Sequence, residues 1–220
     1  MLRYLIICLL LSGTLYAQQF RYGFTVAPKS THLVLPADLY DTPALSFGGF
    51  EYGFLFDQTF GKGEHIGLQF GINLNYGTVG MSQSSDKPTP SFKEWEVRTQ
   101  YLEFPLLARV RTGMIGKMIV YGEGGISPSY CVRARGDYTE NGITHDTDLD
   151  YLASDKNNIY TLRSNMSIQA GLGTEWAITE TAYLVVGFFY RKGLSDVMAD
   201  NNEKSDILLN QTGIRIAGLF

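Results

Sequence analysis

Cysteine, histidine and long apolar runs are scarce in this chain. Its 220 residues include two cysteines and three histidines, and after residue 17 no apolar run reaches the ~18 residues of a membrane-spanning helix. If Cys8 leaves with an export signal, Cys131 is the one remaining thiol, which excludes an intrachain disulfide framework. The formal charge of −4 argues against a basic nucleic-acid-binding protein, so we expect no nucleic-acid partner.

Aromatic residues and glycine are abundant instead. The chain has 14 Tyr, 13 Phe and 24 Gly, and its 45% hydrophobic content excludes wholesale disorder. Charged residues make up 18%, below the roughly 25% of an average globular protein. This composition is compatible with two classes, soluble β-rich domains and outer-membrane barrels.

The first 17 residues have the layout of an export signal. Arg3 gives a positive start, residues 4–11 are apolar, and a region of small residues ends at Ala17. We therefore expect a signal peptide over 1–17 and one mature domain over 18–220. A membrane anchor would need a longer apolar run.

Residues 66–76 alternate between apolar and polar side chains. Six bulky residues share one face, and glycine, asparagine and glutamine share the other. Alternation over eleven residues exceeds the usual strand of five or six and matches the ~9–11 of a membrane-spanning strand. In an outer-membrane barrel the apolar face contacts lipid and the polar face lines the lumen.

The alternating pattern recurs and predicts an all-β fold, an eight-stranded antiparallel transmembrane barrel. The joins between the predicted strands alternate between short and long, as in bacterial outer-membrane barrels. This layout predicts short periplasmic turns, long extracellular loops and two periplasmic termini. The strands are expected at 19–27, 44–57, 65–80, 98–111, 117–132, 161–178, 182–194 and 206–220.

The segment Tyr101-Leu102-Glu103-Phe104-Pro105-Leu106-Leu107 carries a family resemblance. It resembles the recurring "YLEIPLL" strand of the PorT-like family of small bacterial outer-membrane β-barrels. The signal ending Tyr16-Ala17-Gln18 and the terminal Phe220 are similar too. The resemblance implies the barrel fold and an outer-membrane location. It also implies a link to a protein-secretion apparatus, although most members have no assigned activity.

The inward faces predict a lumen with balanced charge. An eight-stranded barrel has room only for side chains, so an Arg–Glu network would plug it. A structural or interaction role in the cell envelope follows, with outer-membrane lipid and other envelope or secretion proteins as partners. A narrow pore is the alternative. The predicted inward charges are Arg21, Arg109, Arg163 and Arg215, with Glu51, Glu103, Glu123 and Glu175.

The long loops hold the remaining candidate sites. They carry 14 acidic against seven basic residues, and Asp146, Asp148 and Asp150 repeat a carboxylate at every second position. This spacing allows a loose calcium or magnesium site or a solvated acidic loop, and it lacks the glycine and final glutamate of an EF-hand. His145 offers the alternative of an enzyme site at the extracellular rim, but an exposed loop histidine is the simpler interpretation. We expect no catalytic activity and no other cofactor.

Overall fold

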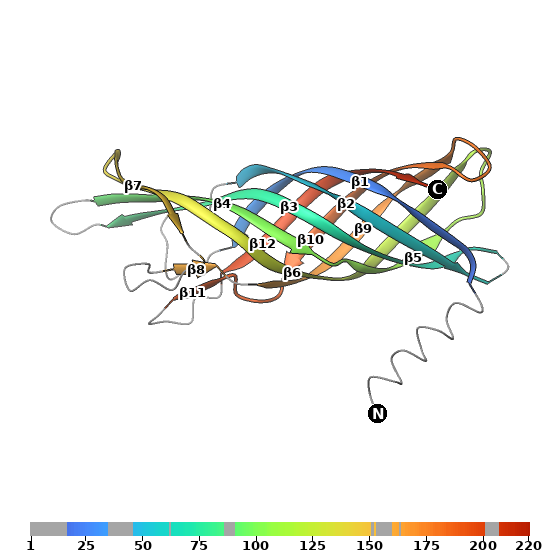
Figure 1. Cartoon of the computed structure of the whole chain (residues 1–220), viewed down its shortest axis with the longest axis horizontal. Coiled ribbons are helices and arrows are strands. Elements are labelled where there is room, and N and C mark those ends of the chain that lie inside the picture. Colours follow the sequence, from blue (N-terminus) through green and yellow to red (C-terminus); the bar gives the residue numbers. More distant parts are fainter. Residues whose placement is uncertain are drawn as a thin grey trace, which may run out of the picture.

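Eight antiparallel wall strands close into a barrel in the computed structural model (Figure 1), as the sequence predicts. The structure describes residues 17–34, 46–61, 63–85, 91–150, 152, 160–162, 164–200 and 207–220. The wall strands are β1 (Ala17–Val34), β2 (Ser46–Phe60), β3 (Ile66–Ser85), β4 (Ser91–Glu103) continued by β5 (Leu106–Arg111), β6 (Met118–Glu140), β9 (Asn165–Ala177), β10 (Tyr183–Gly193) and β12 (Leu208–Leu219). Outside the wall lie β7 (Ile143–Asp150), β8 (Tyr160–Leu162) and β11 (Met198–Asp200).

The first and last strands close the ring. β1 pairs with β12 in antiparallel register, with Gly23 opposite Leu219. Two backbone hydrogen bonds of 3.0 and 2.8 Å join Tyr22 and Phe220 at the end of this seam. Closure pairs the two edge strands of the sheet with each other. A β-sheet can span a lipid bilayer only in such a closed form. The described residues contain no helix with the length and hydrophobicity of a membrane span.

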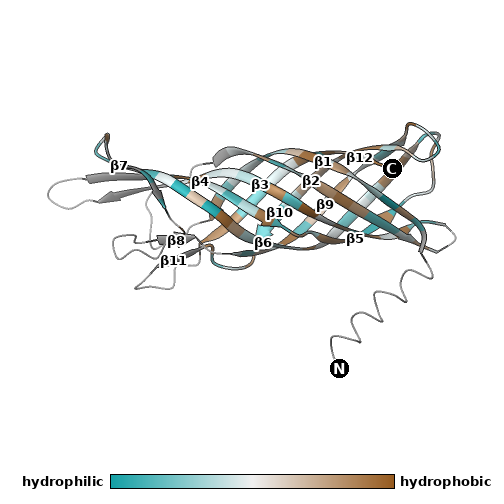
Figure 2. Cartoon of the chain, in the orientation of Figure 1, coloured by the Kyte–Doolittle hydropathy of each residue, from teal (hydrophilic) through white to brown (hydrophobic). Residues whose placement is uncertain are grey.

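Successive side chains point alternately out of the barrel and into it. Outward residues are apolar and exposed, as at Ile72, Leu172 and Ile214. Their inward neighbours are polar and buried, as at Asn73 and Arg215. Figure 2 shows this alternation of hydropathy along the wall strands. Apolar outside and polar inside is the arrangement of a transmembrane barrel, and it confirms the faces predicted from the alternation.

Much of the aromatic content lies on the outer face of β1, β2 and β3. Phe24 and Phe54 meet edge to face at 5.9 Å between ring centroids, and Phe56 stacks on Phe70 at 5.2 Å. These pairs join neighbouring strands, and each such pair adds to the stability of the sheet beyond its buried area.

Pro105 interrupts one wall strand. Proline has no N–H to give to a ladder, and the chain leaves regular pairing at Phe104-Pro105, between β4 and β5. Both neighbouring strands bridge the gap, because Gly71 N donates to the Pro105 carbonyl at 3.2 Å and Phe104 N donates to the Pro128 carbonyl at 2.9 Å. Pro105 thus lies at a strand end, whereas Pro128 lies inside β6, opposite the interruption.

The two ends of the barrel differ. One end carries the short turns after β2, β5 and β9, together with Ala17 and Phe220 (Figure 1). At the other end the strands run further than the alternation predicts. The β3–β4 ladder continues to Ser85 opposite Ser91, and β6 continues to Glu140, turns through Asn141-Gly142 and returns as β7.

Candidate functional site

A network of buried charges fills the lumen. The predicted inward charges that the structure describes are all buried, and Arg163 lies outside the described residues. The predicted set contains only arginine and glutamate, but Lys29, Asp57 and two further arginines are buried as well. Among the described residues, the buried charges are six basic residues, Arg21, Lys29, Arg109, Arg111, Arg191 and Arg215, and five acidic ones, Glu51, Asp57, Glu103, Glu123 and Glu175.

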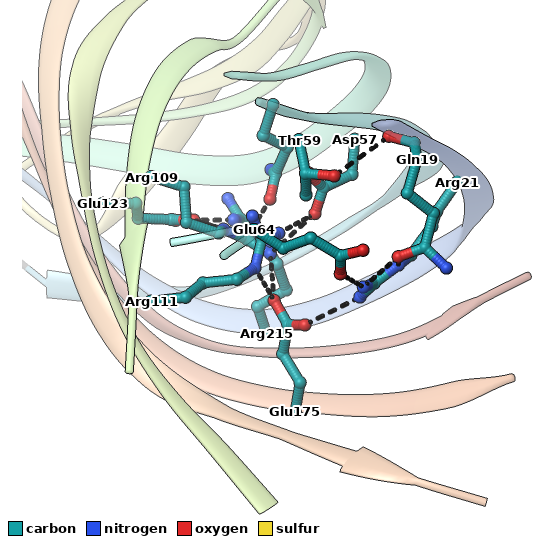
Figure 3. A network of polar contacts seen from close by, with 11 residues as sticks. Gln19, Arg21, Asp57, Thr59, Glu64, Arg109, Arg111, Glu123, Glu175 and Arg215 are labelled. Atoms are coloured by element: carbon teal, nitrogen blue, oxygen red, sulfur yellow. Dashed lines mark hydrogen bonds and ion pairs between the residues drawn. The ribbon is translucent and has the colours of Figure 1, made fainter. Parts of the chain in front are cut away.

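Arg109 is the centre of the network at the short-turn end (Figure 3). It is fully buried, and its guanidinium donates to Glu123 Oε2 at 2.6 Å and to Glu175 Oε1 at 3.0 Å. It also contacts Asp57 at 3.3 Å and lies 4.1 Å from the ring centroid of Tyr121. Three carboxylates from three different strands therefore converge on one cation.

Two further arginines neutralise the same carboxylates. Arg111 follows Arg109 on the inward face of β5, donates to Glu175 at 2.9 Å and pairs with Asp57. Arg21 on β1 donates to Glu175 at 3.1 Å and to Glu64, in the β2–β3 turn, at 3.4 Å. The short-turn mouth of the lumen is thus closed by charged groups that are paired across the barrel.

Gln169 links this cluster to a second one toward the long-loop end. Its amide nitrogen donates to Glu123 at 3.2 Å, and its oxygen accepts a 2.7 Å hydrogen bond from Arg191 Nε. Arg215 adds a 2.7 Å ion pair to Glu123 from the opposite side. The two clusters therefore form one continuous network along the barrel axis.

Arg191 organises the second cluster. Its guanidinium pairs with Glu51 at 2.5 Å and with Glu103 at 2.8 Å. Asn75 donates to Glu103 at 2.9 Å and accepts a hydrogen bond from Lys29. Each ion is compensated by neighbours from other strands, which is the condition under which charges are tolerated out of water.

Little open space remains at this level of the lumen. The cavity lined by Asn75, Tyr101, Glu103 and Arg191 has a volume of about 10 Å³. That is roughly the space of a single water. Cys131 faces the same region and is 4% exposed. At this level the described interior is therefore packed with side chains.

The predicted metal ligands lie on the β6–β7 hairpin. Asn141 and Gly142 form its turn with φ values of 50° and 80°, the positive values that a two-residue hairpin turn of this kind requires. Asp148 is exposed and pairs with Arg135 at 2.5 Å, so one of the three predicted metal ligands is engaged in an ion pair. Asp150 is also exposed, and the Asp146 side chain lies outside the described residues. The described residues contain no cluster of three metal-binding side chains, and the divalent-cation site stays a prediction.

A family model for the outer membrane protein beta-barrel domain matches residues 16–199. The chain belongs to this family of outer-membrane β-barrels. Family membership places it in the bacterial outer membrane. It also explains the inverted polarity, because lipid surrounds the apolar wall and the charged interior is sealed from it. No curated protein sequence matches the chain.

Solved structures of small outer-membrane barrels are similar in fold. OprG of Pseudomonas aeruginosa is 15% identical, with a TM-score of 0.44 and coverage of 93% of this chain and 97% of that one. Neisserial surface protein A is 9% identical, with a TM-score of 0.42 and coverage of 89% and 95%. Ail of Yersinia pestis is 9% identical, with a TM-score of 0.38 and coverage of 92% and 100%.

Proposed function

We propose that this outer-membrane barrel is a non-conducting and non-enzymatic envelope component that presents an extended β-sheet to a partner protein. The sheet consists of the outer parts of β3, β4 and β6 together with β7, and we call it the outer sheet. In the proposed orientation the short turns and both termini are periplasmic, and the outer sheet lies outside the cell.

The unpaired edges of the outer sheet carry this proposal. The β2–β3 ladder ends at Gly49 opposite Gly77, and beyond it β3 pairs, among the described strands, with β4 alone to Ser85. At the other edge β7 pairs with β6 and, among the described strands, with no other. An unpaired strand edge offers backbone donors and acceptors to an added strand. The outer sheet therefore has two edges suited to β-strand addition by a partner.

The reach of the outer sheet supports a contact role. The apolar outward face of β6 ends at Val132, and the strand continues to Glu140. At ~3.3 Å per residue these last residues extend about 25 Å along the strand. A barrel that only anchored itself in lipid would not need such an extension.

Site-specific crosslinking tests the contact. A photoreactive residue replaces Thr144 at the β7 edge, and the matched control carries it at Thr181 in the turn between β9 and β10. We expect one discrete crosslinked protein from position 144 and none from position 181. No crosslinked protein at 144 would contradict the contact role.

Orientation is tested by labelling intact cells with a membrane-impermeant maleimide. Asn141→Cys should label and Thr181→Cys should not, because the two turns lie at opposite ends of the barrel. The native Cys131 is buried and provides the low background. Labelling of position 181 alone would reverse the proposed orientation.

The filled lumen supports the absence of conduction. Arg109 and Arg191 each pair with carboxylates across the bore, so ion passage would require breaking buried ion pairs. We expect no stepwise conductance when the purified barrel is inserted into planar bilayers. Regular conductance steps would favour the narrow-pore alternative.

We further infer a PorT-like subgroup and a link to protein secretion. The inference is supported by Tyr101–Leu107, which forms the interrupted β4–β5 wall strand with Glu103 inside the network. A strain that lacks the gene should secrete fewer proteins while the amount of other outer-membrane barrels stays constant. An unchanged set of secreted proteins would contradict this link.

A further inference from the structure

A cleft on the outside of the barrel wall carries three arginines. It lies where β3, β4, β6 and β7 meet, at the long-loop end. Its floor is the outward face of these strands, and its lining is Tyr76, Arg98, Thr99, Gln100, Arg133, Arg135 and Asp148. Gln100 donates to the Tyr76 hydroxyl at 3.1 Å and so joins β4 to β3 across the cleft.

A β-bulge in β6 turns two of the arginines outward. Tyr101 pairs with Cys131 but Gln100 pairs with Arg133, so Val132 is an extra residue. Cys131 points inward, and unbroken alternation would have placed Arg133 and Arg135 in the lumen behind it. The bulge reverses the alternation and points both arginines away from the lumen. Bulges commonly re-aim side chains in this way.

The resulting arrangement places like charges together. Arg98 and Arg135 are direct cross-strand partners in the β4–β6 ladder. Like charges in opposed positions destabilise a sheet unless something neutralises them. Asp148 does so in part, at 2.5 Å from Arg135 and 3.9 Å from Arg98, and Asp137 lies 3.8 Å from Arg98.

Arg133 is the third cation of the cleft. Within the part of the chain that the structure describes, no carboxylate lies within ion-pair distance of it. The long loops are acidic in sum, whereas this cleft brings together three arginines against Asp148 and Asp137. An anion between the three guanidinium groups would remove their mutual repulsion.

The cleft lies immediately beyond the apolar band. On β6 the exposed Tyr130 and Val132 precede Arg133, and on the neighbouring wall strand Leu102 and the exposed Phe104 follow Gln100. In the orientation proposed above, this is the level of the outer-leaflet headgroups. Basic clusters at that level bind anionic headgroups, and the guanidinium fork matches the oxygens of a phosphate.

We propose that this cleft binds a phosphate on the headgroup of an anionic outer-leaflet glycolipid, with Arg98, Arg133 and Arg135 as its ligands. The inference rests on the proposed orientation for its cellular meaning. Asp148 acts as a positioning residue, because it holds two of the guanidinium groups beside the cleft. The Tyr76 ring provides an apolar wall for the sugar or acyl part of the lipid.

Lipid retention by the full-length barrel tests the proposal. The protein is reconstituted in phosphatidylcholine nanodiscs with diphosphoryl lipid A or with the same lipid stripped of both phosphates, and bound lipid is quantified by native mass spectrometry. We expect the phosphorylated lipid to be retained about tenfold more strongly, a usual contribution of a charge-assisted hydrogen bond. Equal retention of the two lipids would overturn the proposal.

Variants locate the binding. Arg133→Gln should lose most of the preference, and adding Arg98→Gln should abolish it. Lys192→Gln is the matched control, because Lys192 is an exposed outward cation on β10, away from the cleft. Arg133 takes part in none of the ion pairs among the described residues, so Arg133→Gln should keep the unboiled gel mobility of the wild type. A change in its lipid retention can then be interpreted as a change in binding. An unchanged preference in Arg133→Gln would refute the assignment.

Two further arms separate the alternatives. Inorganic phosphate at millimolar concentration should not displace the lipid, and full displacement would show a site for free phosphate instead. Retention in nanodiscs does not depend on orientation in the cell, whereas the maleimide labelling reports orientation only. A failure of the lipid site and a failure of the proposed orientation are therefore distinguishable.

Discussion

Removing the central arginine of the lumen tests the idea that the charge network holds the barrel together. Arg109→Met keeps most of the side-chain volume and removes the cation. The variant leaves Glu123, Glu175 and Asp57 without the group that contacts all three. It also removes the guanidinium that lies against the ring of Tyr121.

The expected cost follows from the remaining partners. Leaving one member of a buried ion pair alone costs about 3–5 kcal/mol. Arg111 still pairs with Asp57 and Glu175, and Arg215 still pairs with Glu123. We therefore expect the lower end of that range, about 3 kcal/mol. Arg135→Met is the matched control, because its ion pair with Asp148 is 42% and 52% exposed and should contribute less than ~1 kcal/mol.

Urea unfolding in detergent micelles measures both variants. Trp176 lies on the lipid face, so its fluorescence reports the loss of the barrel. Arg109→Met should lower the free energy of unfolding by about 2 kcal/mol more than Arg135→Met does. If both variants unfold at the wild-type midpoint, the network fills the lumen without stabilising it, and the reasoning fails.

Three further outcomes are expected. Unboiled and boiled samples should migrate differently on a detergent gel, because closed barrels resist detergent unfolding; identical migration with a helical circular dichroism spectrum would contradict the fold. Gly142→Val should speed proteolysis between residues 133 and 160 without changing barrel stability, because φ is 80° at this turn and valine avoids that region. A turn that is cut at the wild-type rate would contradict this. If Asp146, Asp148 and Asp150 bind a divalent cation, Ca²⁺ should slow that same proteolysis relative to chelator, and equal rates would leave a solvated acidic loop.

Alternation of side chains predicts the barrel because it repeats in most strands. It predicts the inward positions of Arg109, Glu123 and Arg215 for the same reason. It fails for Arg191, because β10 is apolar on both faces, with Val185 and Phe189 inside and Phe188 outside. Without a polar face, the direction of a strand's side chains cannot be deduced from its pattern.

Strand ends and bulges account for the other differences. The first strand is predicted to end at residue 27, but β1 runs on to Val34 and buries Lys29. Arg133 and Arg135 continue the alternation of Cys131 in the sequence, and only the cross-strand register reveals the extra residue at Val132. Ion-pair partners such as Arg21 and Glu175 depend on how the strands are staggered around the ring, which no local pattern encodes.

The seam between β1 and β12 has a consequence for the order of assembly. It joins residues from opposite ends of the chain, so the last strand must be present before the wall is complete. Two lumen ion pairs also join distant parts of the chain. Arg21 on β1 pairs with Glu175 on β9, and Glu123 on β6 pairs with Arg215 on β12. A partly formed sheet would therefore hold unneutralised charges facing a bilayer and would gain little by entering it. We expect insertion and closure to occur together as a single cooperative step, with slow folding set by these contacts between distant parts of the chain.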